Sequence, residues 1–151
     1  MEARCGELTV LLVSSCREDR LSLASLFDHT NWILLDAETC AETSEVLQRA
    51  HVPVVICDDL LRDGDWKDVL RLTAESEDPP LLIVASRVAD DSLWAEVLNL
   101  GGYTVLDKPF DRTELTRVVS LAYRQHHETC TRFQCSAVPS RAVGAVAGHC
   151  L

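Results

Sequence analysis

Long apolar runs are missing from this sequence of 151 residues. No run approaches the roughly 20 consecutive apolar residues that a helix needs to cross a bilayer. The first ten residues, MEARCGELTV, also lack the basic stretch and the apolar region that make up a secretory signal peptide. We therefore expect a soluble, cytoplasmic protein.

Basic residues are few compared with acidic ones. The chain has 14 Lys and Arg against 24 Asp and Glu, which gives a net charge of −10. Proteins that bind nucleic acids cluster Lys and Arg to displace the counterions of the phosphates, and no basic run is found here. The sequence also lacks a GxGxxG motif and a P-loop. These absences argue against direct nucleic-acid binding and against a nucleotide site, whereas an acidic cleft for cations is compatible with the charge.

Paired cysteine motifs are absent as well. The seven cysteines are an odd number and form no CxxC pair, so we expect free thiols. One stretch combines histidines with cysteines, at His126, His127, Cys130 and Cys135. Its spacing is irregular and does not match a zinc motif, which argues against a metal site built from these four residues.

Aromatic residues make up only 5% of the chain, against 47% for all hydrophobic residues, so the core should be aliphatic. Short apolar runs that predict buried strands alternate with segments of helical periodicity. The predicted strands are residues 8–13, 32–35, 52–57, 81–85 and 103–106. The predicted helices are residues 17–29, 41–50, 66–74, 92–100 and 111 to about 125.

This alternation predicts an α/β fold with a five-stranded parallel sheet that is doubly wound, in the flavodoxin-like strand order 2-1-3-4-5. Helix ends are marked by Thr39 and Asp111 as N-caps and by Gly101 with Gly102 as a stop signal. We expect one domain over residues 1–127. Periodicity fades after it, and residues 128–151 are interpreted as a flexible C-terminal tail.

In such sheets, ligands bind at the carboxyl ends of the strands. The loops at this edge carry Ser14 and Ser15 after the first strand, and Asp58 with Asp59 after the third. The fourth and fifth strands are followed by Ser86 and by Lys108. An acid, a hydroxyl and a lysine on neighbouring loops could form an aspartyl-phosphate, with the carboxylate as nucleophile and the other two groups holding phosphoryl oxygens. Taken separately, the acids could be ordinary loop residues and Ser86 could be a local cap.

The motifs VVICDD, VAS and LDKPFD, which follow the third, fourth and fifth predicted strands, resemble the receiver domain of bacterial two-component response regulators. The similarity covers residues 8 to about 125. It implies that Asp58 is the phosphoacceptor, with Asp59 as the runner-up. It also implies that Ser86 and Lys108 are the phosphate-sensing hydroxyl and lysine.

The sequence departs from the family pattern at the metal pocket, which the resemblance places at Ser14, Ser15, Asp58 and the backbone carbonyl of Leu60. The family has two acids where Ser14 and Ser15 stand, and hydroxyls are weak ligands for Mg²⁺. The sequence thus predicts a degenerate Mg²⁺ site, and it indicates no organic cofactor. Glu18 and Asp19 follow, but their place in the first helix puts them too far along the chain to replace the missing acids.

Two further positions differ from the family. Arg62 stands where a proline is usual, and Val105 stands where the family has an aromatic switch residue. Tyr103 lies two residues before Val105, so we expect both side chains on one face of the strand. The output surface that the resemblance implies comprises Trp94, Tyr103, Val105, Pro109 and Phe110.

We therefore expect a stand-alone receiver-like module of phosphorelay signal transduction, not an enzyme. It would act through protein–protein contact, with weakened phosphorylation at Asp58. The partner would be a histidine kinase or a downstream signalling protein, and residues 91–125 could form a homodimer. The alternatives are a phosphorylation-independent pseudo-receiver and a flavodoxin-like protein that binds a small ligand.

Overall fold

A computed structural model describes residues 8–28, 30–76 and 78–142, with side chains as far as residue 128. Its centre is a parallel sheet of five strands in the order β2-β1-β3-β6-β7. The predicted fold class and strand order are confirmed. The strands are β1 (Thr9–Val13), β2 (Ile33–Ala37), β3 (Val54–Asp58), β6 (Leu81–Ser86) and β7 (Thr104–Asp107).

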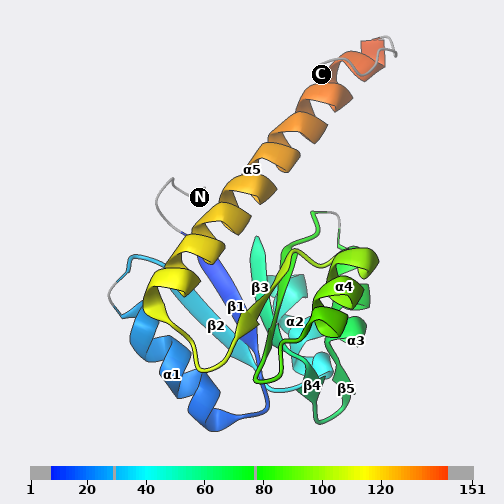
Figure 1. Cartoon of the computed structure of the whole chain (residues 1–151). Helices are drawn as coiled ribbons and strands as arrows, with labels where there is room; N and C mark the ends of the chain where they lie inside the picture. The colour runs from blue at the N-terminus through cyan, green and yellow to red at the C-terminus, as the bar shows by residue number, and fades with distance from the viewer. Residues whose placement is uncertain (1–7, 29, 77, 143–151) are drawn as a thin grey trace.

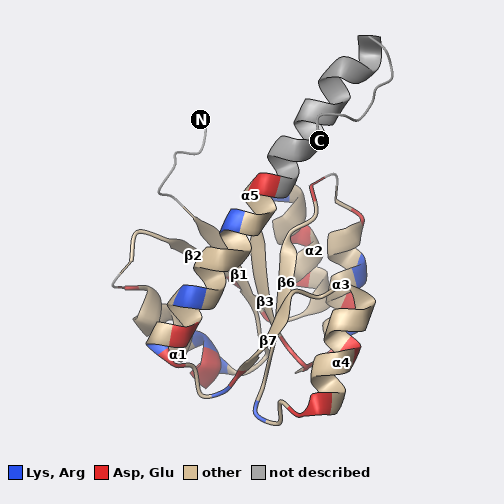
Figure 2. Cartoon of the chain, turned by 45° about the horizontal axis from the view of Figure 1, so that its top comes forward, with Lys and Arg blue, Asp and Glu red and all other residues tan. Residues whose placement is uncertain are grey.

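Five helices cover the two faces of the sheet (Figures 1 and 2). They are α1 (Arg17–Phe27), α2 (Cys40–Arg49), α3 (Trp66–Ala74), α4 (Asp91–Leu100) and α5 (Arg112–Ala142). Successive strand residues point to opposite faces, so β3 supplies Val54 and Ile56 to the cluster beneath α1 and α5. The same strand supplies Val55 and Cys57 to the cluster beneath α2, α3 and α4. Burial on both faces explains why the strands have continuous apolar sequences.

The helix boundaries follow local chemistry. Thr39 accepts a hydrogen bond from the backbone N–H of Glu42 at the start of α2, and Asp111 accepts one from Glu114 at the start of α5. Gly101 ends α4 with a φ of 110°, the left-handed conformation that glycine adopts without strain. These three sequence predictions are confirmed.

Two features of the fold differ from the predictions. A hairpin of two-residue strands, β4 (Leu60–Leu61) and β5 (Gly64–Asp65), lies between β3 and α3, and strands this short have no periodicity to detect. The predicted end of the last helix at about residue 125 is wrong, because α5 continues to Ala142 and extends away from the sheet (Figure 1). Apolar periodicity reports a buried face, and a helix that leaves the core no longer needs one.

No glycine occurs between Gly102 and Gly144 to stop α5 earlier. The division of the chain into a domain over residues 1–127 and a flexible tail over 128–151 stays a prediction, and residues 143–151 lie outside the described part.

Among the described residues, no helix is both long enough and apolar enough to span a membrane.

Candidate functional site

The carboxyl edge of the sheet brings Ser14, Asp58 and Lys108 together. Ser14 follows β1, Asp58 is the last residue of β3, and Lys108 follows β7. Because these strands are parallel and adjacent or nearly so, their ends meet at one edge. The Ser14 side chain is fully buried and Asp58 is 5% exposed, so the polar groups of this pocket depend on one another for hydrogen bonds.

Both carboxylate oxygens of Asp58 are engaged. Oδ2 accepts a hydrogen bond of 2.6 Å from the hydroxyl of Ser14. Oδ1 lies 2.6 Å from Nζ of Lys108 in a buried ion pair. The backbone N–H of Cys16 in turn donates to the Ser14 hydroxyl over 3.1 Å, which holds the serine in place. Each oxygen of the Asp58 carboxylate therefore contacts a protein group, Oδ2 the Ser14 hydroxyl and Oδ1 the Lys108 ammonium.

Asp59, the runner-up for the phosphoacceptor, lies outside this pocket. Its Oδ2 accepts a 2.9 Å hydrogen bond from the hydroxyl of Ser86, which itself accepts one from the backbone N–H of Val88. Ser86 is thus near the site but bonds to Asp59 and to its own loop. The structure brings Lys108 to Asp58, and it does not bring Ser86 into hydrogen-bond contact with Asp58.

Lys108 bridges two acids. Its Nζ is 2.6 Å from Asp58 Oδ1 and also 2.6 Å from Oδ2 of Asp19, and its side chain is only 6% exposed. Burial lowers the pKa of Lys108, but the hydrogen bonds and charges of Asp19 and Asp58 raise it by more, so the pKa lies above its usual value. Lys108 is consequently a fixed cation, held between two carboxylates.

Asp19 is the residue of this pocket that the sequence analysis set aside. It is the third residue of α1 and is buried together with Leu23 and Phe27, four and eight positions further on. Its Oδ1 pairs with the guanidinium of Arg87 at 3.2 Å, while Oδ2 pairs with Lys108. The sequence spacing could have revealed this position. Asp19 is four residues before the buried Leu23, and residues four apart in a helix lie on the same face, here the face that packs against the sheet.

The site is electrically balanced by its own residues. Asp19 and Asp58 contribute two negative charges, while Lys108 and Arg87 contribute two positive ones. A hard divalent cation needs several oxygen ligands with excess negative charge. The Asp58 oxygens are already bound to an ammonium and a hydroxyl, so these residues as arranged do not fit Mg²⁺.

The other residues of the predicted metal pocket do not favour Mg²⁺ binding either. The Ser15 hydroxyl donates to the carbonyl of Glu38 over 2.8 Å and accepts from the backbone N–H of Arg62. Arg20 adds a further cation, since it donates to the Ser14 carbonyl over 2.9 Å. Leu60 lies in β4 with its side chain exposed.

The predicted output residues divide between a groove and the core. A groove of about 350 Å³ crosses β7 between α4 and α5 and is lined by residues that include Trp94, Tyr103 and Val105. Pro109 is exposed in the following loop, whereas Phe110 packs on the cluster beneath α5. Trp94 is 39% exposed and Val105 only 4%, so the side chains available to a partner come mainly from the helices.

The expectation that Tyr103 and Val105 share one face of the sheet is wrong. Val105 belongs to the cluster beneath α2, α3 and α4, whereas Tyr103 packs on the cluster beneath α1 and α5. The reason is that β7 begins at Thr104. Tyr103 stands before the strand, where the alternation of a pleated strand does not apply.

The chain resembles solved receiver domains. No protein-family model and no curated protein matches it. The signal receiver domain of an HD domain-containing protein from Pseudomonas fluorescens Pf-5 is 22% identical, with a TM-score of 0.76 and coverage of 87% of this chain and 98% of that one. The beryllofluoride-activated NtrC4 receiver domain dimer is 21% identical, with a TM-score of 0.71 and coverage of 78% and 98%.

A third similar structure is the receiver domain of a sensor histidine kinase from Pseudomonas aeruginosa PAO1, described with a magnesium ion in its active-site cleft. It is 18% identical, with a TM-score of 0.70 and coverage of 78% of this chain and 98% of that one. Identities at this level establish a shared fold. The chain has the fold of a receiver domain, which confirms the resemblance seen in its sequence.

Proposed function

We propose that this chain is a receiver-like module of phosphorelay signal transduction that acts through contact with protein partners, and that Asp58 is a weakened phosphoacceptor. The observation that carries this function is the position of Lys108 Nζ, 2.6 Å from both Asp58 and Asp19. The contact of an acid with a lysine at the carboxyl edge of the sheet supports this proposal. Asp19, which also contacts Lys108, and the equal number of positive and negative charges in the pocket weaken the proposed phosphorylation of Asp58.

The physical argument concerns the nucleophile. Phosphoryl transfer depends mainly on positioning and on neutralisation of charge. An attacking oxygen of Asp58 must leave either the Lys108 ammonium or the Ser14 hydroxyl, which hold the two oxygens at 2.6 Å each. Lys108 could hold a phosphoryl oxygen instead, but Asp19 competes for the same ammonium. We therefore expect slow and incomplete phosphorylation, with the phosphoryl group ending on Asp58 and no further turnover, so the chain is not an enzyme.

The partner surface in this proposal is the face formed by α4, β7 and α5. Large apolar side chains are exposed there, with Trp94 at 39%, Leu98 at 51% and Leu121 at 38%. Exposed apolar side chains grouped around a groove are typical of surfaces that bind proteins. The partner is a histidine kinase, a downstream signalling protein or a second copy of the chain, and a cytoplasmic location belongs to the same proposal.

The test is to incubate the protein with acetyl phosphate, and separately with beryllofluoride, each with and without Mg²⁺. Intact-mass spectrometry and amide NMR shifts would be recorded for the wild type, Asp58→Asn and Asp19→Asn. We expect a small adduct in the wild type and none in Asp58→Asn. Asp19→Asn should give more adduct, because Lys108 then has one acid fewer to hold. Asp59→Asn is the matched control and should leave the yield unchanged.

Rapid and complete labelling of the wild type would contradict a weakened acceptor. Labelling that persists in Asp58→Asn but disappears in Asp59→Asn would move the acceptor to the neighbouring residue. The Ser14 hydroxyl bound at 2.6 Å to Asp58 favours a second candidate, a pseudo-receiver that works without phosphorylation. An absence of adduct in every variant, on well-folded protein, would support that candidate.

A further inference from the structure

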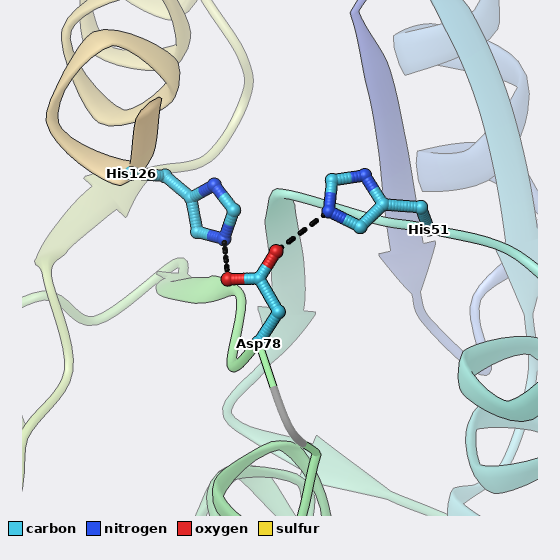
Figure 3. A group of neighbouring side chains, drawn as sticks. All are labelled: His51, Asp78 and His126. Carbon is cyan, nitrogen blue, oxygen red and sulfur yellow. Dashed lines mark hydrogen bonds and ion pairs between the residues drawn. The ribbon is translucent and has the colours of Figure 1, made fainter. Parts of the chain in front are cut away.

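Three potential metal ligands converge in one group (Figure 3). Two of them precede β3 and β6, so the group lies near the amino ends of these strands, whereas Lys108 follows the carboxyl end of β7. His51 stands between α2 and β3, Asp78 stands between α3 and β6, and His126 lies on α5. Nε2 of His51 is 2.7 Å from Asp78 Oδ2, and Nε2 of His126 is 3.2 Å from Asp78 Oδ1. Among the described residues, this is the only group of three such ligand atoms, all within 4.8 Å of one another.

The His126 ring provides an independent sign of a ligand. The residue is only 5% exposed, and its Nε2 is buried without a well-aligned hydrogen bond to any described residue. Its Nε2 lies 3.2 Å from Asp78 Oδ1 without a well-aligned hydrogen bond, so a cation between the nitrogen and the carboxylate would give both atoms a partner.

We propose that His51, Asp78 and His126 bind a divalent transition-metal ion, and that Zn²⁺ is the metal that suits them. Imidazole ligands favour zinc and its neighbours, whereas Mg²⁺ and Ca²⁺ prefer oxygen alone. Zinc held tetrahedrally at about 2.0–2.2 Å has ligand atoms roughly 3.3 Å apart. The nitrogen-to-oxygen distances are 2.7 Å to Asp78 Oδ2 and 3.2 Å to Oδ1, and all three ligand atoms lie within 4.8 Å of one another, so side-chain rotation can bring them to that spacing.

The exposure of the ligands decides the character of the site. The side chains of His51 and Asp78 are 65% and 36% exposed, so His51 can rotate into place and solvent can supply the fourth ligand. Two neutral imidazoles and one carboxylate leave one positive charge on a bound Zn²⁺ site. That charge is favourable on a chain whose net charge is −10.

A bound ion would connect three separate segments. His126 is the last buried side chain that the structure describes on α5, and the helix continues from there to Ala142. The metal would therefore fasten α5 to the segments before β3 and β6, at the point where the helix leaves the sheet. Its role would be to set the direction of the extended part of α5.

The experiment is a titration of full-length, chelator-treated protein with Zn²⁺, in competition with a chromophoric chelator. Parallel titration with Co²⁺ would record the visible absorption of the bound ion. We expect one ion per chain, with affinity reduced by more than about tenfold in His51→Asn, Asp78→Asn and His126→Gln. His127→Gln is the matched control, since His127 is adjacent on α5 but exposed and stacked on Tyr123, and it should bind as the wild type does.

The outcomes are separable. Binding that is unchanged in His51→Asn and in Asp78→Asn would overturn the site, as would thiolate-to-cobalt absorption, which would assign the ion to the cysteines. His51→Asn keeps the test valid if His126→Gln fails to fold, because His51 is on the surface. A rise in Tm with Zn²⁺ should accompany binding and should disappear in the same variants. Asp58→Asn should bind zinc normally, so this result does not depend on the phosphoacceptor.

Discussion

Lys108 is the residue on which the charged pocket depends. Its ammonium is the only cation shown within 4 Å of Asp58 among the described residues, and it also contacts Asp19. Both acids are less than one-tenth exposed. A buried carboxylate without a cation is strongly unfavourable, because the interior cannot replace water as a solvent for charge. Substitution of any one of these charged residues should therefore destabilise the protein, because it leaves a buried charge without its partner.

We predict that Lys108→Met lowers the free energy of unfolding by about 3–5 kcal/mol, the usual cost of leaving a buried charge without its partner. Denaturant unfolding measures this change. Lys67→Met is the matched control, since Lys67 also contacts a carboxylate at 2.6 Å but does so on the surface, and it should change stability little. The triple variant Lys108→Met, Asp19→Asn, Asp58→Asn should regain part of the loss. Equal effects of the two single lysine variants would contradict a buried ion pair.

Alkylation of the Cys40 thiol should depend strongly on pH. Burial and the nearby charge of Asp63 raise its pKa to about 11. The thiolate is the reactive form, so at pH 8 alkylation should be about a hundredfold slower than for a thiol with the ordinary pKa of 9. The rate should rise with pH until the thiol is ionised near pH 11. Peptide mapping after timed treatment with iodoacetamide measures the rate at each pH.

Asp63→Asn should speed the labelling of Cys40 at pH 8, because it removes a negative charge that disfavours the thiolate. Asp36→Asn, a change at another exposed acid, should leave the rate as it is. A Cys40 rate that stays constant between pH 8 and 10 would show that access to the thiol, and not its ionisation, limits the reaction.

Among the elements, α3 has the most complete N-terminal cap. Asp65 accepts hydrogen bonds from the backbone N–H groups of Lys67 and Asp68, and the Asp68 side chain accepts from the backbone N–H of Asp65. This capping box also ends the β4–β5 hairpin that follows β3. A Cβ on Gly64 would collide with the Asp68 carboxylate, so the hairpin and the cap require each other's geometry.

We predict that Asp65→Ala destabilises the protein by about 1 kcal/mol, the typical cost of losing an N-cap. Thermal and denaturant unfolding both measure it. Asp65→Asn keeps an acceptor oxygen and should lose less. Asp91→Ala is the control, because Asp91 lies in the first turn of α4 while Asp90 makes the cap there. Similar losses for Asp65→Ala and Asp91→Ala would mean that charge near the helix end matters more than the cap.

The whole molecule presents one face suited to association. Trp94 of α4 and Leu121 of α5 are exposed apolar residues that line the groove over β7, and Leu98 and Leu100 of α4 are exposed as well. The edge strand β7 pairs only with β6, so this side of the sheet is covered by two helices and not by another strand. Contact with a second protein would bury these side chains without rearranging the core.

We predict that Leu98→Glu lowers self-association, because it introduces a charge into the apolar face. Sedimentation velocity over a range of concentrations should show the average mass of the wild type rising with concentration, while the variant stays near one chain. Leu21→Glu, a change at an exposed leucine of α1, should behave as the wild type. A wild type that remains monomeric throughout would contradict the homodimer and leave this face to a different protein.

The sequence predicts the sheet well because its central strands β1, β3 and β6 are buried on both faces, and burial produces the apolar runs by which strands are recognised. Asp58 and Lys108 follow from the same logic, since the ends of parallel strands meet at one edge. Asp19 could not be placed with equal ease, because it reaches the pocket from a helix and not from a strand end. Its contact with Lys108 depends on how α1 packs against the sheet.

The group of His51, Asp78 and His126 could not be predicted from the sequence at all. In the sequence, His126 stands beside His127 and near two cysteines, and that stretch has no metal spacing. The neighbours that matter come from before β3 and before β6, at residues far from it in the chain. Only the three-dimensional arrangement of α5 over the sheet brings them together.

The ion pair between Lys108 and Asp19 has a consequence for the kinetics of folding. It joins residues 89 positions apart, and the hydrogen bond from Ser14 to Asp58 spans 44. Contacts between such distant segments carry the largest loop-closure entropy and require most of the sheet to be in register beforehand. The pocket should therefore form late, and its loss in Lys108→Met should appear mainly as faster unfolding while the refolding rate changes little. The same charges that hold Asp58 in place would then set how long the native state persists.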